Sequence, residues 1–280
     1  MNLLYINWNP DPVLFSIFGH DIRWYSIFWL VALTSGSYVV HKLYIIKKIP
    51  DDTFNTLFIY SFLGILIGAR LGHCLFYDPG YFLSHPLEMI LPIHIMPDGK
   101  WIFTGYTGLA SHGGTIGLII SLFFFCRKTK IHYLDILDMM GVAAPLAAGF
   151  IRIANLMNSE IIGTSTNVPW AFIFEHVDLQ PRHPAQLYEA IAYFIFYLII
   201  RHKAKRKKEN YKRGYYFGLC ITFIFTFRFF IEFLKERQVD FEESLCIDMG
   251  QILSIPFIAL GIFFIIRSSK KQKSLNNTIS

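Results

Sequence analysis

Residues 54–76 read FNTLFIYSFLGILIGARLGHCLF, and this stretch of 23 residues contains a single charged side chain, Arg70. A helix needs about 20 mostly apolar residues to cross the ~30 Å hydrocarbon core of a bilayer. The stretch therefore predicts a membrane-spanning helix, and its arginine requires a separate explanation.

Six further apolar stretches bring the prediction to about seven transmembrane helices, so the expected fold is an all-α integral membrane protein. The stretch 114–126 is short and reaches spanning length only if its helix starts near His112. The stretch 132–157 carries Asp135 and Arg152, so neighbouring helices must shelter it. Six spans are the alternative. The six further stretches are 24–46, 114–126, 132–157, 185–201, 214–234 and 249–267.

The composition points the same way. Of the 280 residues only 16% are charged and 54% are hydrophobic, whereas soluble domains average roughly 25% charged residues. The composition therefore argues against a water-soluble enzyme, an ordinary globular domain, a disordered chain and a secreted disulfide scaffold. The cysteines stand alone, without CxxC or Cys/His spacing, so neither a metal site nor a disulfide is predicted. They are Cys74, Cys126, Cys220 and Cys246.

Lysine and arginine are distributed unequally between the two sets of predicted loops. Eighteen lie around one set and in the tail. Five lie on the other side: Arg23, Lys100, Arg182, Lys235 and Arg237. Because cytoplasmic loops carry the excess of basic residues, we expect the N-terminus outside and the C-terminus in the cytoplasm. The net charge of +6 thus reflects topology and anionic lipid, and no nucleic acid partner is expected.

We expect a single membrane domain over residues 1–280 with three appendages. Residues 1–23 predict an external arm at the membrane interface, 77–111 an external head segment, and 268–280 a cytoplasmic tail. The first residues lack a basic start and a small-residue cleavage site, so the first helix is expected to stay as an anchor.

Arg70, Arg152 and Arg228 lie inside predicted spans. Each costs at least ~2.5–3.5 kcal/mol at mid-helix unless it is paired or near water. With the predicted orientation, all three lie in the outer half of the bilayer.

Other polar residues occur at the same predicted depth. Arg228 and Glu232 have i, i+4 spacing, which predicts a pair on one helix face. Asn155 follows Arg152 at i+3, and Glu160 comes just beyond. This set suits a phosphate-bearing lipid, because the planar fork of arginine donates two parallel hydrogen bonds. The alternative is that these residues pair structurally and that Arg70 and Arg152 extend to headgroups.

The segment SHGGTIG, residues 111–117, contains His112 where a span begins. A helix N-terminus disfavours imidazolium and helps to keep this histidine neutral, so it can accept a proton. Gly113 and Gly114 allow close approach of backbone or ligand. The alternative is a helix cap followed by packing glycines.

These residues lie in motifs that resemble the prolipoprotein diacylglyceryl transferase family of bacteria. The motifs follow the family's order over about residues 20–265. They are WYS with Tyr25, GARLG with Arg70, SHGGTIG with His112, RIANLMNSEIIG from Arg152 to Gly163, RHPAQLYE from Arg182 to Glu189, FRFFIEF with Arg228 and Glu232, and MGQILSIP from Met249 to Pro256. The signature at 152–163 usually has glycine where this chain has Ala154 and Ser159, which could restrict close backbone packing.

The resemblance implies transfer of the diacylglyceryl group of phosphatidylglycerol to the thiol of the lipobox cysteine of a preprolipoprotein. The products are a thioether and glycerol 1-phosphate. Expected partners are phosphatidylglycerol, the preprolipoprotein signal peptide and membrane lipids, in the bacterial plasma (inner) membrane, with the active site toward the outer leaflet. Phosphatidylglycerol carries its own leaving group, so no cofactor is expected.

On this resemblance, Arg152 and Arg228 stabilise the leaving phosphate and His112 is the first candidate for general base. Glu232 completes the expected catalytic set. The group that takes the thiol proton stays open. Substrate-binding roles are expected for Tyr25, Arg70, Gly113, Gly114, Asn155, Glu160, Gly163 and His183.

Two other classes of protein are alternatives. A transporter or flippase for an anionic lipid or solute also places charges inside the membrane, but it predicts them at several depths. The cytoplasmic halves of the predicted membrane-spanning helices are largely apolar apart from Asp135 and Asp138. The second alternative is a non-catalytic lipid-binding scaffold, in which His112 would have only a structural role.

Overall fold

A computed structural model describes residues 5–17, 19–96, 99–103, 108–206, 213–236 and 248–276. Cys246, the basic residues Lys207, Lys208, Lys212 and Arg237, and the last four residues of the predicted tail lie outside these ranges. The chain forms two compact units: unit 1 comprises residues 1–43 and 137–280, and unit 2 comprises residues 44–136. Because each unit is described by itself, the single membrane domain stays a prediction.

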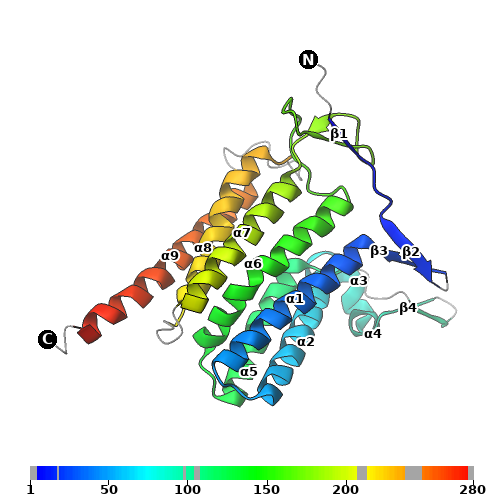
Figure 1. Cartoon of the computed structure of the whole chain (residues 1–280). Helices are drawn as coiled ribbons and strands as arrows, with labels where there is room; N and C mark the ends of the chain where they lie inside the picture. Colours follow the sequence, from blue (N-terminus) through cyan, green and yellow to red (C-terminus); the bar gives the residue numbers. More distant parts are fainter. Residues whose placement is uncertain are drawn as a thin grey trace. The chain divides into compact units, whose positions relative to one another are not determined.

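Each of the predicted apolar stretches is helical (Figure 1). The helix over the shortest stretch begins one residue before His112, as its spanning length requires. The last helix extends into the predicted tail. The helices are α1 (Trp24–Ile46), α2 (Asp51–Phe76), α5 (Ser111–Thr129), α6 (Tyr133–Met157), α7 (Ala185–Arg206), α8 (Tyr215–Ile231) and α9 (Met249–Asn276).

In the described part of the chain, four helical segments are long and apolar enough to cross a membrane by length and composition. They are α2, α6, Tyr215–Leu234, which joins α8 to the 3-10 turn η1 (Glu232–Leu234), and Met249–Ser268 of α9. Large apolar side chains are exposed on these helices, for example Ile67 and Phe263. Such surfaces suit hydrocarbon rather than water. The chain is therefore a mostly helical membrane protein, as predicted; seven spans and the orientation stay predictions.

Glycines bring α2 and α5 together in unit 2. A Cβ atom added at Gly117 would lie 2.1 Å from the carbonyl oxygen of Gly64, and one at Gly113 would lie 2.2 Å from that of Gly68. The two backbones therefore touch, as in other membrane helix pairs with small residues at the interface.

We expect Gly117→Val to destabilise the protein by about 1–3 kcal/mol, because the added side chain must push the two backbones apart. Thermal unfolding in detergent measures this change. The matched control is Gly36→Ala in α1, where the new Cβ would meet only Ala147 Cβ at 3.7 Å. Equal melting temperatures for the two variants would contradict the close packing.

The predicted head segment contains short elements: α3 (Pro79–Ser84), α4 (Pro86–Ile90), β4 (Ile93–Ile95) and β5 (Trp101–Phe103), the two strands pairing antiparallel. Glu88 of α4 organises them. Its buried carboxylate accepts the Ile95 backbone N–H at 2.8 Å and the Tyr81 hydroxyl at 2.7 Å, and lies 3.1 Å from His94 Nδ1. One carboxylate thus ties α3, α4 and β4 together. The location of this segment on the external side of the membrane stays a prediction.

We expect this cluster to weaken in acid. The backbone N–H of Ile95, with help from Tyr81 and His94, lowers the pKa of Glu88 from 4.5 to about 2. A carboxylate with a lowered pKa stabilises the fold above its unfolded pKa, and this contribution is lost as the pH falls from 4.5 toward 2. Limited proteolysis at pH 7 and pH 3 measures the effect, and Glu88→Gln should flatten the dependence. If the wild-type protein and Glu88→Gln showed the same change in proteolysis rate between pH 7 and pH 3, this account would be contradicted.

Helices α6, α7, α8 and α9 lie side by side in unit 1 (Figure 1). Asp138 of α6 is completely buried and accepts the backbone N–H groups of Gly214 at 2.7 Å and Phe217 at 2.9 Å at the start of α8. In unit 2, Asp135 forms an ion pair with Lys47 at 3.5 Å. Both aspartates therefore have structural partners.

Residues from the predicted interfacial arm form strands. In unit 1, β1 (Ile6–Trp8) pairs parallel with β6 (Phe172–Phe174), which pairs antiparallel with β7 (Pro181–Arg182). β2 (Val13–Ile17) and β3 (His20–Arg23) form a hairpin. Trp8 packs on the small core of Leu156, Ile162, Phe172 and Phe174. This contact anchors the N-terminal strands at the end of α6; their position at a membrane interface stays a prediction.

Candidate active site

The last turn of α6 positions the first group of predicted site residues. Arg152 Nη1 donates to Asn155 Oδ1 at 3.0 Å, and Asn155 Nδ2 donates to Glu160 Oε1 at 2.7 Å. Gln186 of α7 donates to the Glu160 carbonyl oxygen at 2.6 Å. The i, i+3 spacing of Arg152 and Asn155 thus produces the contact that it predicts.

The two departures from the resembled signature are accommodated. Ala154 is completely buried, and Ser159 adopts a φ of 52° in the turn after α6. Glycine enters this left-handed region without steric cost, so serine carries mild strain there. The turn is nevertheless closed by a hydrogen bond from the Glu160 N–H to the Asn155 carbonyl oxygen at 3.1 Å.

Glu189 is a central residue that we did not predict. It is completely buried on α7, and its Oε2 lies 3.0 Å from Arg152 Nε and 3.3 Å from Lys235 Nζ. Its Oε1 accepts the Tyr193 hydroxyl at 3.0 Å. The RHPAQLYE motif contains this glutamate, and a carboxylate near the start of an apolar helix was the signal that could have revealed it.

The predicted pair of Arg228 and Glu232 does not form. Glu232 Oε2 instead accepts from Lys235 Nζ at 3.2 Å. Helix α8 ends at Ile231 and the chain turns into η1, so the i+3 residue reaches this carboxylate. A Cβ at Gly250 would lie 2.4 Å from Glu232 Oε1, so glycine lets the N-terminus of α9 approach the carboxylate, where the helix dipole stabilises an anion.

Arg228 is half-buried on α8. Within the residues that the structure describes, its guanidinium has neither a hydrogen bond nor an ion pair. It lies close enough to Tyr193 for a Coulombic interaction, and Glu232 interacts in the same way with Arg152. Among the described residues, the N–H donors of Arg228 are thus not engaged in hydrogen bonds, and they lie beside the network of Arg152 and Glu189.

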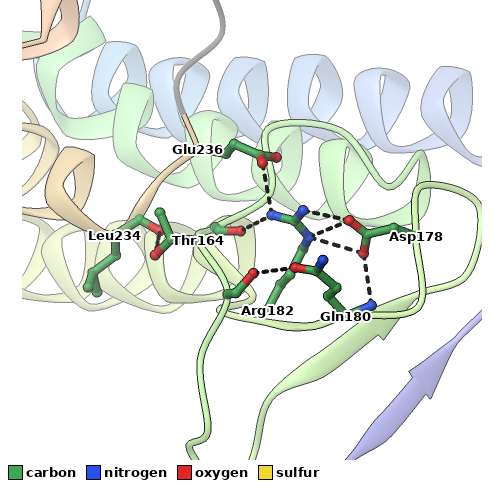
Figure 2. Close-up of polar contacts among 8 residues, drawn as sticks. Thr164, Asp178, Gln180, Arg182, Leu234 and Glu236 are labelled. Atoms are coloured by element: carbon green, nitrogen blue, oxygen red, sulfur yellow. Dashed lines mark hydrogen bonds and ion pairs between the residues drawn. The ribbon is translucent and has the colours of Figure 1, made fainter. Parts of the chain in front are cut away.

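A second cluster surrounds Arg182, which begins the RHPAQLYE motif and was expected on the external side without a role in the site (Figure 2). Arg182 Nε donates to both carboxylate oxygens of Asp178, at 3.1 and 3.0 Å, and Nη1 lies 3.1 Å from Glu236 Oε1. Nη1 also donates to the Gly163 carbonyl oxygen at 3.2 Å. The hydrogen bonds from Arg182 lower the pKa of Asp178. The cluster therefore stays charged at neutral pH and joins three chain segments.

Gly163 has a packing role in this cluster. A Cβ there would lie 2.5 Å from the His183 carbonyl oxygen and 2.7 Å from that of Leu234. Gly163 also forms a β-bridge with Lys235. A residue with a side chain would separate these segments, so the glycine predicted to bind substrate helps to hold the Lys235 backbone.

His183 lies half-buried beside Tyr188 and Trp170. Its Nδ1 is 3.3 Å from the Tyr188 hydroxyl, which accepts from Trp170 Nε1 at 2.8 Å. Burial lowers the pKa of His183, so the imidazole is neutral at pH 7.

Tyr25 lies in the first turn of α1, half-buried, with its ring 6.4 Å from that of Trp29. Its hydroxyl has no hydrogen bond among the described residues. The hydroxyl is therefore available to a ligand.

Arg70 of unit 2 is buried and binds protein carbonyls. Nη2 donates to the Glu88 carbonyl oxygen at 2.6 Å and Nε to that of Met89 at 3.3 Å, while the guanidinium lies 4.9 Å from the Phe82 ring centroid. The alternative in which Arg70 extends to headgroups is therefore wrong: this arginine anchors α4.

His112 lies in the first turn of α5, and its side chain is exposed. The N-cap is Ala110, so the alternative in which His112 caps the helix is wrong. Gly113 packs on the α2 backbone as the alternative expected, whereas a Cβ at Gly114 would make an ordinary contact with Ala69 Cβ at 3.4 Å.

The structure thus joins Arg152, Asn155, Glu160 and Glu232 in one polar network of unit 1. Two residues that we did not predict, Glu189 and Lys235, connect them. Lys235 was counted as an external charge, although its i+3 spacing from Glu232 predicts a contact. Convergence with the unit 2 residues Arg70, His112, Gly113 and Gly114 stays a prediction.

The fold and this network define a helical membrane protein with a buried polar site in which arginine and lysine meet carboxylates. A family model described as prolipoprotein diacylglyceryl transferase matches residues 12–267. The chain belongs to this family.

Full-length relatives agree with the family match. A phosphatidylglycerol–prolipoprotein diacylglyceryl transferase of Bacteroides fragilis is 61% identical over 270 residues, covering 96% of this chain and 98% of the relative. Proteins of the same name from Chloroherpeton thalassium and Porphyromonas gingivalis are 42% and 40% identical, covering 96% and 95% of both chains.

Proposed function

We propose that this chain transfers the diacylglyceryl group from phosphatidylglycerol to the thiol of the lipobox cysteine in a preprolipoprotein. The cysteine sulfur forms a bond to the glyceryl carbon that carries the phosphate. The carbon–oxygen bond breaks, and its electron pair leaves with glycerol 1-phosphate. The thiol proton passes to a base. The three relatives named above, which are 61%, 42% and 40% identical over nearly the full length, bear the name of this activity.

One observation carries the assignment of the phosphate site: the Arg228 guanidinium has neither a hydrogen bond nor an ion pair among the described residues, although it lies beside the Arg152 network. An intramembrane cation without an ion pair marks a ligand site. A phosphodiester supplies the missing anion, and guanidinium groups stabilise the charge that develops on its leaving oxygen. Glu160 and Asn155 orient Arg152, and Tyr25 hydrogen-bonds the headgroup.

His112 is the proposed general base toward the incoming thiol. A thiol has a pKa near 8.5 and reacts as the thiolate, so proton removal accelerates attack. The exposed imidazole at the start of α5 supports this role. His183 provides a second binding group near the network.

The proposed setting is the bacterial plasma membrane, with seven spans, the N-terminus outside and the site near the outer leaflet. The 18-to-5 division of basic residues supports this orientation. The contacts of Asp135 and Asp138 weigh against the transporter alternative, which needs polar groups unengaged along a path.

The test uses purified protein, phosphatidylglycerol and a lipobox peptide, with mass spectrometry of the peptide. We expect a diacylglyceryl increment on the cysteine. A peptide with serine in place of that cysteine is the matched control. If the cysteine peptide lacked the increment, the proposed transferase activity would be refuted.

A further inference from the structure

Lys235 is a buried cation that the proposed reaction does not yet use. Its side chain is 5% exposed, and its ammonium bridges two carboxylates, with Nζ at 3.3 Å from Glu189 Oε2 and 3.2 Å from Glu232 Oε2. These glutamates come from α7 and η1. Its backbone is held by the bridge to Gly163. A lysine buried in this way requires a reason, because burial of a charge is costly unless it is paired.

We propose that Lys235 is a positioning residue for Arg152: it shares the charge of Glu189, so that this carboxylate orients Arg152 without occupying its donors. The proposal rests on the proposed function. Its geometric basis is that Glu189 Oε2 lies 3.0 Å from Arg152 Nε, yet no partner meets this oxygen in hydrogen-bond geometry within the described part of the chain. Glu189 therefore does not grip Arg152 in a bidentate fork.

The physical argument concerns competition for one guanidinium. Arginine and carboxylate readily form two parallel hydrogen bonds, and burial strengthens this tendency. Without Lys235, Glu189 would have Arg152 as its remaining cationic contact among the described residues, and the fork would close. Glu189 would then occupy the N–H donors of Arg152, and these donors would no longer be available to an incoming phosphate. Lys235 thus prevents Glu189 from forming a bidentate contact with Arg152, and it also neutralises the charge of Glu232.

The experiment compares Lys235→Met, Lys235→Arg and the double variant Lys235→Met/Glu189→Gln. We expect Lys235→Met to raise KM for phosphatidylglycerol by about tenfold or more, the size of one charge-assisted contact, with KM for the lipobox peptide little changed. Lys235→Arg should keep most of the affinity. The double variant removes one charge of each sign and should recover much of the loss. Lys203→Met, on the exposed end of α7, is the control.

A merely structural lysine gives a different pattern. In that case melting temperature falls, both KM values change together, and the double variant is no better than Lys235→Met; this result overturns the proposal. Retention of phosphatidylglycerol against phosphatidylethanolamine, read by native mass spectrometry of each variant, judges the proposal without turnover. If the wild-type protein makes no adduct, the proposed function fails, and unequal lipid retention still supports the role of Lys235, whereas equal retention overturns it.

Discussion

Arg152→Lys should lower kcat/KM for diacylglyceryl transfer by about 10²- to 10³-fold, the range for loss of a donor that stabilises developing charge. The guanidinium meets Asn155 through Nη1 and Glu189 through Nε. Lysine keeps the positive charge but has no planar fork, so it cannot hold both contacts and still donate to a phosphate. The mass-spectrometric assay of the lipobox peptide measures the change.

The matched control is Arg267→Lys on α9, because Arg267 is exposed and has neither a hydrogen bond nor an ion pair among the described residues. It should keep wild-type turnover. Near-normal turnover of a folded Arg152→Lys protein would contradict the assignment of Arg152 to the phosphate site. Arg228 would then be the remaining candidate for the arginine that stabilises the leaving phosphate.

Asp138→Ala should destabilise the protein by about 2–6 kcal/mol, because a buried donor left unsatisfied costs about 1–3 kcal/mol and this carboxylate accepts from two donors. The N–H groups of Gly214 and Phe217 at the start of α8 would lose their acceptor. Thermal unfolding in detergent should show a large fall in melting temperature. Asp138→Asn, which keeps one acceptor oxygen, should lie between alanine and wild type.

Asp135→Ala provides the comparison, since its ion pair with Lys47 is partly exposed and such pairs contribute about 0–1 kcal/mol. The folded fraction of Asp138→Ala should transfer the diacylglyceryl group normally. A stable but inactive Asp138→Ala protein would revive the transporter alternative, in which this aspartate lies on a path.

The positions of the helices were predictable because a bilayer imposes one length and one polarity on every helix that crosses it. The stretches 24–46 and 54–76 correspond to helices with the bounds 24–46 and 51–76. The strands β1 and β6 were not predicted. They are three residues each, and their pairing joins residues more than 160 positions apart, which no local pattern encodes.

The candidate site was predictable in part, for a related reason. Arg152 and Asn155 share one helical turn, so local spacing was sufficient to predict their contact. Arg228 and Glu232 also share a helix, yet the prediction was wrong because the turn at η1 brings Lys235 to the carboxylate. The predicted ligand-binding role of Arg70 stays a prediction, and local spacing did not predict its contacts with carbonyl oxygens of α4, 18 and 19 residues away.

The sequence by itself determined the membrane class, the helix positions, the family resemblance and the residues that carry charge into apolar helices. These properties follow from local hydrophobicity and from the cost of burying charge. Only the tertiary structure decided that Glu189 of α7 is the carboxylate that Arg152 and Lys235 share. Ion pairs form over a few ångströms between side chains from different helices, so their partners depend on how those helices pack.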